Sequence, residues 1–255
     1  MPITFVTIPV RADNYVYLVH DSGTGATAVV DVGDAQAVRA ALDARGWQLS
    51  EIWLTHHHSD HIEGTEELAA ATGAKVTGAA ADAHRLPKLD RKVSEKEGFV
   101  FAGHEVKILD VPGHTVGHIA YYVPDLKAAF TADSLMTLGC GRLFEGSAAQ
   151  MWASLSKLAD LPAETMICSG HEYTLGNARF ALTIDPGNQA LKDRVAEVEA
   201  LRAEGKPTVP RSLAEEKATN PFLRARSPGI RAHLGLGASS DAEVFAEIRR
   251  RKDQF

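Results

Sequence analysis

The segment His56-His57-His58-Ser59-Asp60-His61 brings together several side chains that can bind a transition metal. If its backbone is extended, successive side chains alternate, so His56 and His58 point to one side and His57 points to the other. A turn at Ser59 would then direct Asp60 and His61 toward a second ion. This spacing predicts a metal site and not a chance grouping of histidines.

Further ligands follow turns and strands elsewhere in the chain. His114 and His171 each follow a glycine, which lets the backbone bend the side chain inward. Asp133 follows the apolar run 128–131, and a carboxylate can bridge two cations. The predicted metal ligands are His56, His58, Asp60, His61, His114, Asp133 and His171. This set exceeds the needs of one ion and predicts two divalent metal ions.

Two such ions would favour hydrolysis. At a separation of about 3.5 to 4 Å they can hold a bridging water, lower its pKa from about 15.7 toward about 7, and polarise a carbonyl oxygen. A structural site usually closes its shell with four ligands, often including cysteine, and this set leaves room for water. Asp60 and Asp133 are the predicted catalytic carboxylates. Zinc is the predicted metal, with iron and manganese open because the same ligands suit them.

The ligands lie where predicted strands end. Strands are predicted at 3–8, 15–19, 26–32, 52–54, 75–78, 106–111, 119–123, 128–131 and 166–168. Helices are predicted at 34–45, 62–72 and 191–201, and from the capping boxes at Ser147 and Ser240. Residues 82–105 are predicted to be a surface excursion, and no strand is predicted after about residue 175. We expect an α+β chain, with a metal-binding domain at 1–172 and a helical domain at 173–255.

The composition excludes several classes of protein. The chain has 255 residues, of which 45% are hydrophobic and 24% charged, as in an ordinary soluble globular protein. The net charge of -6 argues against binding to nucleic acid. No apolar run of about 18 residues and no N-terminal signal pattern occur, so a cytoplasmic protein without membrane contact is predicted. Cys140 and Cys168 do not support a disulfide framework.

Several motifs carry a family resemblance. Thr55-His-His-His-Ser-Asp-His resembles the T-H-x-H-x-D-H signature of the metallo-β-lactamase superfamily. The segments 112–119, 130–135, 139–147 and 170–177 resemble those of the glyoxalase II (hydroxyacylglutathione hydrolase) family. Asn220-Pro-Phe-Leu-Arg and the terminal Arg250-Arg-Lys-Asp-Gln-Phe are similar to that family's C-terminal segments. The resemblance covers essentially the whole chain.

The resemblance implies a fold, a ligand arrangement and a reaction. The fold is an αββα metallo-β-lactamase-like sandwich followed by a small C-terminal helical domain. One metal takes His56, His58 and His114, the other takes Asp60, His61 and His171, and Asp133 bridges them. The reaction is hydrolysis of the thioester S-(2-hydroxyacyl)glutathione, chiefly S-D-lactoylglutathione, to glutathione and a 2-hydroxy acid in methylglyoxal detoxification.

The resemblance also implies a substrate site. Glutathione carries two carboxylates, which arginine and lysine can bind. The implied binding residues are Arg142, Phe144, Tyr173, Arg249 and Lys252. The family often has lysine where Arg142 stands and tyrosine where Phe144 stands. The first difference keeps the charge, whereas the second loses a hydroxyl, at a cost of about 0.5 to 1.5 kcal/mol in binding. The predicted partner is this small molecule, and a monomer is expected.

Other functions remain as alternatives. A glutathione persulfide dioxygenase with one iron, or another hydrolase, would use the same scaffold, although the complete second ligand set opposes the dioxygenase. A superfamily nuclease would need a basic channel. A β-lactamase would be exported. A non-enzymatic metal sensor would need its open coordination positions blocked.

Two roles are open for His118. Its ring could support the side chain of His114, or it could pack within its strand.

Overall fold

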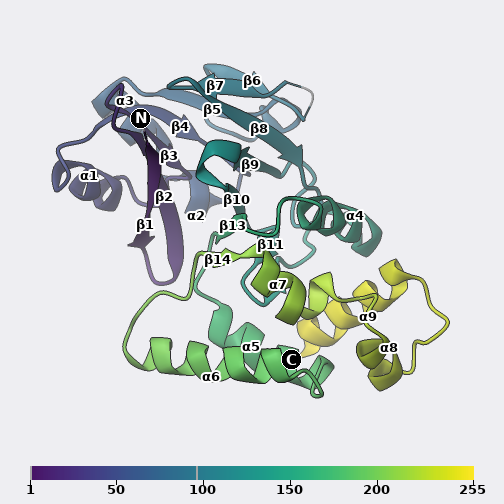
Figure 1. The fold of residues 1–255 in the computed structure, drawn as a ribbon. Coiled ribbons are helices and arrows are strands. Elements are labelled where there is room, and N and C mark those ends of the chain that lie inside the picture. Colours follow the sequence, from purple (N-terminus) through teal and green to yellow (C-terminus); the bar gives the residue numbers. More distant parts are fainter. Residues whose placement is uncertain (1, 96) are drawn as a thin grey trace. The chain divides into compact units, whose positions relative to one another are not determined.

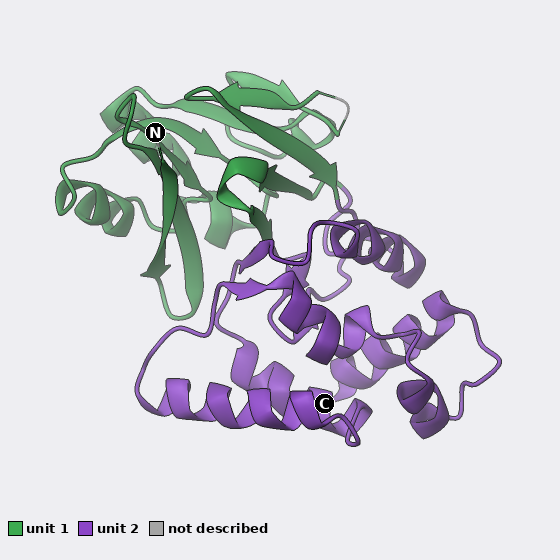
Figure 2. Cartoon of the chain, in the orientation of Figure 1, with its two compact units in different colours: residues 1–110, 117–131 green, residues 111–116, 132–255 purple. Residues whose placement is uncertain are grey.

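The chain forms two compact units. The computed structural model describes residues 2–95 and 97–255. Unit 1 comprises residues 1–110 and 117–131, and unit 2 comprises residues 111–116 and 132–255 (Figure 2). The predicted boundary near residue 172 is not the boundary between these units. Residues 132–172 group with the helices, as in the contact of Trp152 with Phe245, whose ring centroids lie 6.0 Å apart.

Unit 1 contains a six-stranded sheet (Figure 1). Its strands in order are β1 (Ile3–Val10), β2 (Asn14–Asp21), β3 (Ala26–Val30), β4 (Gln48–Trp53), β5 (Lys75–Ala79) and β6 (Arg91–Val93). Strands β1 to β3 pair antiparallel, and β3 to β6 pair parallel. The carboxyl ends of β3 and β4 therefore lie at the same edge of the sheet.

Helices of unit 1 bury an apolar face against this sheet. They are α1 (Ala35–Asp43), α2 (Ser59–Ile62) and α3 (Thr65–Thr72), with a 3-10 turn η1 (Ala80–Asp82). Val38 and Leu42 of α1 and Leu68 of α3 join the same core as Leu18 and Ile52 of the sheet. Asp34 accepts a hydrogen bond from the N–H of Ala37 at 3.0 Å, which confirms the predicted N-cap.

A second layer of strands packs on the other face. It contains β7 (Phe99–Phe101), β8 (His104–Asp110), β9 (Ile119–Val123) and β10 (Ala128–Ala132), with a 3-10 turn η2 (Pro124–Leu126). Aromatic rings join the layers: the centroids of Tyr17 and Phe130 lie 5.5 Å apart, as do those of Trp53 and Tyr121. The surface excursion predicted at 82–105 contains two strands that the sequence did not predict, β6 and β7, which pair with β5 and β8 despite their short length.

Unit 2 contains most of the helices. They are α4 (Ala148–Ala159), α5 (Thr174–Ile184), α6 (Gln189–Ala203), α7 (Leu213–Thr219), α8 (Pro228–Leu234) and α9 (Asp241–Gln254), with a 3-10 turn η3 (Pro221–Leu223). Its strands are β11 (Leu135–Met136), β12 (Gly139–Cys140), β13 (Met166–Ser169) and β14 (Arg211–Ser212). Strand β11 pairs antiparallel with β12, and β13 with β14.

The helix signals of unit 2 are partly confirmed. The capping boxes at Ser147 and Ser240 begin α4 and α9, and the predicted helix at 191–201 lies within α6. The sequence did not predict α5, α7 and α8, and the prediction of no strand after residue 175 missed β14. In the part of the chain that the structure describes, no helix is both long and apolar enough to cross a membrane.

Candidate metal centre

The end of β4 carries the histidine-rich loop in unit 1. His58 has an extended backbone and Asp60 and His61 lie in the short helix α2, as the predicted turn at Ser59 requires. His57 Nδ1 lies 3.0 Å from Asp82 Oδ2, so this ring is held by another acidic side chain. His56 and His61 are buried, and His58 and Asp60 are half-buried. The loop presents alternate side chains as the sequence indicates.

Asp31, which the sequence reasoning missed, organises this loop. It follows β3 with a φ of +61° and is 3% exposed. Its carboxylate accepts hydrogen bonds from Thr55 N at 2.9 Å and Thr55 Oγ1 at 2.8 Å. His61 Nδ1 lies 2.9 Å from Asp31 Oδ2. Because an ionised carboxylate can only accept, Nδ1 of His61 carries the proton and Nε2 keeps its lone pair for a metal.

Two further contacts orient ligands in unit 1. Asn14 Nδ2 donates to Asp60 Oδ2 at 2.8 Å. Thr55 Oγ1, which donates to Asp31, lies 3.0 Å from His56 Nδ1 and accepts its proton, which leaves Nε2 of His56 available. The His118 ring stacks on His56, with centroids 4.6 Å apart and planes inclined by 12°, so His118 supports a ligand of the loop by packing.

Unit 2 brings His114, Asp133 and His171 together. His114 Nδ1 lies 2.8 Å from the carbonyl oxygen of Arg142, which can only accept, so Nδ1 carries a proton and the Nε2 of the neutral ring can bind a metal. His114 Nε2 lies 3.4 Å from Asp133 Oδ2, and His171 Nε2 lies 3.3 Å from the same oxygen. Two ligands about 2.1 Å from one ion at a tetrahedral angle are about 3.4 Å apart. The spacing of these three residues is therefore the spacing expected of ligands that bind metal ions.

Gly141 explains how these side chains come so close. A Cβ atom at Gly141 would lie 1.9 Å from the carbonyl oxygen of Asp133 and 3.0 Å from His114 Nδ1. Only glycine leaves space for the backbone to pass between the two residues. The motif around residue 141 is therefore part of the metal site.

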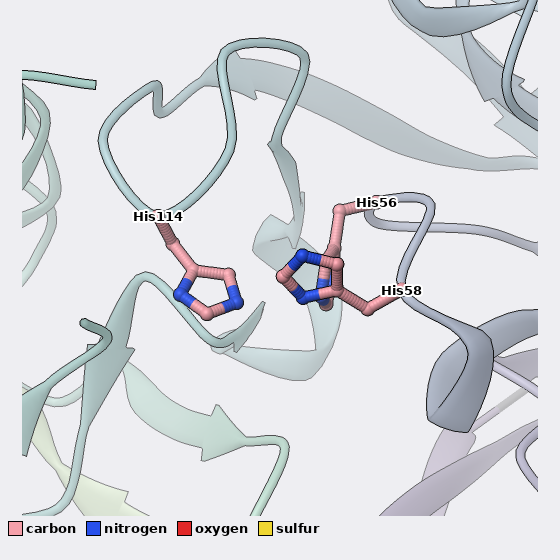
Figure 3. A group of neighbouring side chains, drawn as sticks. All are labelled: His56, His58 and His114. Atoms are coloured by element: carbon pink, nitrogen blue, oxygen red, sulfur yellow. The ribbon is translucent and has the colours of Figure 1, made fainter. Parts of the chain in front are cut away.

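Among the described residues, three groups of possible ligand atoms lie within 4.8 Å of one another. They are His56 with His58 and His114, Asp60 with His61 and His171, and Asp31 with His56 and His61. Figure 3 shows the first group, with His56 and His58 on one loop and the three imidazole rings converging. Histidine nitrogen and carboxylate oxygen suit zinc, iron and manganese alike.

The residues that the sequence associates with glutathione all lie in unit 2. Phe144 and Tyr173 are 61% and 44% exposed, and their rings lie against His114 and His171 respectively. Tyr173 stacks on His171 with centroids 4.6 Å apart. Arg142 is exposed, and its Nε lies 3.9 Å from Asp253 Oδ1.

Arg249 and Lys252 are more enclosed. Arg249 is 5% exposed, donates to the carbonyl of Cys140 at 3.1 Å, and pairs with Asp253 at 2.7 Å. Lys252 Nζ donates to the carbonyl of Gly176 at 3.2 Å. Burial lowers the pKa of Lys252, and the positive charges of Arg249 and Arg142 lower it further. A cluster of cations thus surrounds one carboxylate.

Comparison with known proteins first defines the class. Residues 11–171 match the metallo-beta-lactamase superfamily, and residues 172–255 match the family described as hydroxyacylglutathione hydrolase C-terminus. A solved B3 metallo-beta-lactamase, BLEG-1, superposes with a TM-score of 0.67 at 20% identity, covering 86% of this chain and 99% of its own. A di-iron-bound structure of the protein TTHA1623 superposes with a TM-score of 0.62 at 24% identity, covering 86% and 98%. The fold is therefore that of a metallo-β-lactamase-type metal-dependent hydrolase with an added helical segment, as predicted, and it implies a dinuclear metal site.

The full-length relatives are more specific. A hydroxyacylglutathione hydrolase of Roseobacter denitrificans is 62% identical over all 255 residues and over all of its own length. This chain belongs to the hydroxyacylglutathione hydrolase family.

Proposed function

We propose that the chain hydrolyses S-(2-hydroxyacyl)glutathione, chiefly S-D-lactoylglutathione, to glutathione and D-lactate in methylglyoxal detoxification. The observation that carries this proposal is the position of Asp133 Oδ2, 3.4 Å from His114 Nε2 and 3.3 Å from His171 Nε2. This arrangement occurs in a chain that shares its whole length with proteins named hydroxyacylglutathione hydrolase. A glutathione persulfide dioxygenase has no comparable support.

The proposed ligands divide into two sets. His56, His58 and His114 would hold one ion, Asp60, His61 and His171 would hold the other, and Asp133, whose Oδ2 lies beside both His114 and His171, would complete the site. When bound, the ions supply an acidified water and polarise the thioester carbonyl. Zinc is the proposed metal. A thiolate leaves readily, so the chain needs no strong general acid for the glutathione sulfur.

The residues around the ligands orient the substrate. Arg142, Arg249 and Lys252 offer cations for the glutathione carboxylates, and Tyr173 and Phe144 offer rings beside the metal ligands. Because Asp253 pairs with Arg249, a substrate carboxylate that binds Arg249 directly competes with Asp253. Cys140 and Cys168 are buried thiols, and the proposed reaction uses neither of them. A cytoplasmic location and a monomeric state stay predictions.

The test is hydrolysis of S-D-lactoylglutathione by purified full-length protein, with the metal content per chain measured on the same sample. We expect rapid turnover that a chelator removes and added metal restores. His58→Ala removes a proposed ligand and should lower kcat by several orders of magnitude. His233→Ala is the matched control, since this imidazole is exposed, its Nε2 lies 3.0 Å from the carbonyl oxygen of Thr183, and it lies outside the proposed ligands.

The possible outcomes test the proposed substrate and the proposed metal site separately. Two bound metals without thioester turnover would reject the proposed substrate and retain the metal site. Full turnover in His58→Ala, or in metal-free protein, would reject the two-metal mechanism. Oxygen consumption with glutathione persulfide, measured on the same sample, should be absent and would support the dioxygenase if present.

A further inference from the structure

A short hairpin connects the metal ligand Asp133 to Arg142. Strands β11 and β12 form this hairpin, and its ends are joined by a hydrogen bond from Gly141 N to the carbonyl of Ser134 at 3.1 Å. Beyond the hairpin, the carbonyl oxygen of Arg142 accepts a hydrogen bond from His114 Nδ1. The position of the hairpin therefore affects the Asp133 carboxylate on one side and the His114 ring on the other.

The turn of the hairpin is held by buried polar side chains of α5 and of the residue that follows α7. Asn220 Nδ2 donates to the carbonyls of Met136 and Gly139, both at 3.0 Å. Asn177 Nδ2 donates to the carbonyl of Thr137 at 3.1 Å. Both asparagines are buried, at 0% and 6% exposure. Three carbonyl oxygens in this four-residue turn thus accept hydrogen bonds from side chains that lie far along the chain.

Glu216 holds the remaining residue of the turn. Leu138, which has a φ of +55°, donates its N–H to Glu216 Oε2 at 3.0 Å. Glu216 is fully buried, and Arg194 pairs with its other oxygen. Asn220 Nδ2 also donates to Glu216 at 3.0 Å. The left-handed conformation of a non-glycine residue costs energy, and the bond to Glu216 stabilises it.

If stability were the only requirement, a buried charge pair would be a costly way to provide it. Apolar side chains of similar volume often stabilise a core equally well, whereas a hydrogen-bonded polar network selects one arrangement. Here Arg194 pairs with Glu216, Glu216 accepts from Leu138 N in the turn, and Asn220 Nδ2 donates to carbonyls of the same turn. Its evident effect is to select the conformation of the hairpin.

We propose that Asn220 and Glu216 are positioning residues for the metal centre, acting through the hairpin on Asp133 and His114. This inference rests on the proposed function for the assignment of those two ligands. The Asn220-Pro-Phe-Leu-Arg motif then acts on the metal site. The helices within residues 173–255 therefore do more than contact the substrate. Neither side chain touches the reacting groups.

The test compares two asparagines that cap helical turns. Asn220 Oδ1 accepts from Phe222 N, and Asn188 Oδ1 accepts from Leu191 N. Asn220→Asp keeps the cap but replaces the amide donors that hold Met136 and Gly139. Asn188→Asp makes the same change at a site whose donors go to Asp185 and Ala218. Both variants would be made in the full chain and loaded with zinc or cobalt.

The readouts are metal affinity by chelator competition, the visible spectrum of the cobalt form, and the melting temperature. We expect Asn220→Asp to bind metal about 10- to 100-fold more weakly than wild type, with an altered cobalt spectrum. Asn188→Asp should match wild type in both. Equal metal affinity and equal spectra in the two variants would overturn the proposal, whatever their melting temperatures.

A second variant provides the test if Asn220→Asp does not fold. Asn177→Ala removes a single donor, to Thr137, and should weaken metal binding several-fold with kcat reduced more than KM is raised. Wild-type metal affinity in folded Asn177→Ala would then count against the proposal. If wild-type protein binds two metals but does not hydrolyse the thioester, the proposed function fails while this comparison still decides the positioning role.

Discussion

Asp31 Oδ2 accepts a hydrogen bond from His61 Nδ1 at 2.9 Å, and both side chains are buried. The same carboxylate binds the backbone N–H and hydroxyl of Thr55, at the start of the histidine loop. One acidic residue thus sets the tautomer of a ligand and the position of the loop that carries three others. This positioning effect does not require Asp31 to bind a metal ion.

We expect Asp31→Asn to lower metal affinity about 10- to 100-fold, because the amide replaces one acceptor oxygen by a donor. Asp21→Asn is a matched control: Asp21 also ends a strand, is 3% exposed, and accepts from a backbone N–H and a threonine hydroxyl, both of Thr24. Metal content after dialysis and chelator competition measure the effect. Equal metal affinity in the two variants would contradict this role for Asp31.

Gly141→Ala should disrupt the metal centre without unfolding unit 1. The added Cβ would lie 1.9 Å from the Asp133 carbonyl oxygen, so the backbone of one residue must move. We expect turnover to fall at least about 100-fold with loss of bound metal, since small displacements of ligands are costly. Gly187→Ala, where no atom lies within 4 Å of the added Cβ, is the control. The prediction fails if Gly141→Ala retains two metals per chain.

Arg249→Ala should chiefly raise KM. The variant removes a cation proposed to bind a glutathione carboxylate, and a loss of about 1.4 kcal/mol corresponds to a tenfold rise. Steady-state kinetics with S-D-lactoylglutathione measure the change. Arg250→Ala, which removes an exposed guanidinium paired with half-buried Glu247, provides the control and should leave KM unchanged. A fall in kcat with constant KM would show that Arg249 acts on the chemical step instead.

Lys252 should make binding of glutathione sensitive to alkaline pH. Burial and the neighbouring Arg249 and Arg142 lower its pKa below 10.5, while Asp253 opposes this shift. Since only the protonated amine attracts a carboxylate, affinity should fall as pH rises through this lowered pKa. Calorimetric titration with an S-alkylglutathione, which cannot hydrolyse, measures the dependence.

The Lys252→Arg variant isolates this group, because arginine stays charged across the range. Tyr173 and all other titrating groups remain in both proteins, so the difference between the two profiles reports Lys252. We expect the variant to keep its affinity at pH values where wild type loses it. Identical profiles would exclude Lys252 as the cause. For stability the sign is opposite: a lowered lysine pKa makes the folded state gain stability as pH rises toward 10.5.

The two cysteines should be unreactive in the folded protein. Burial raises the pKa of the Cys140 thiol to about 11, against the opposing effect of Arg249, and burial also raises the pKa of Cys168. At about pH 8 only about one Cys140 thiol in a thousand is ionised, and the thiolate is the reactive form. Thiol titration should be slow in native protein and give two groups in guanidinium. Rapid reaction of either thiol before unfolding would contradict this prediction.

The sequence by itself determined the local elements and the chemistry of the site. Alternating apolar residues predicted most strands of unit 1, and polar residues at helix starts predicted α1, α4 and α9 because capping is a contact within a few residues. The types and spacing of the histidines and aspartates indicated the metal site in the same local way. These signals need no knowledge of the fold.

Only the tertiary structure showed what supports that site. The bonds from Asp31 to His61 and from Asn220 to the 135–140 hairpin join residues 30 and more than 80 positions apart, and no periodicity encodes such pairs. The short strands β6 and β7 exist because neighbouring strands pair with them, and their own three residues could not form them alone. Arg249 likewise has a sequence typical of an exposed helix end, and packing against Cys140 and Phe222 buries it.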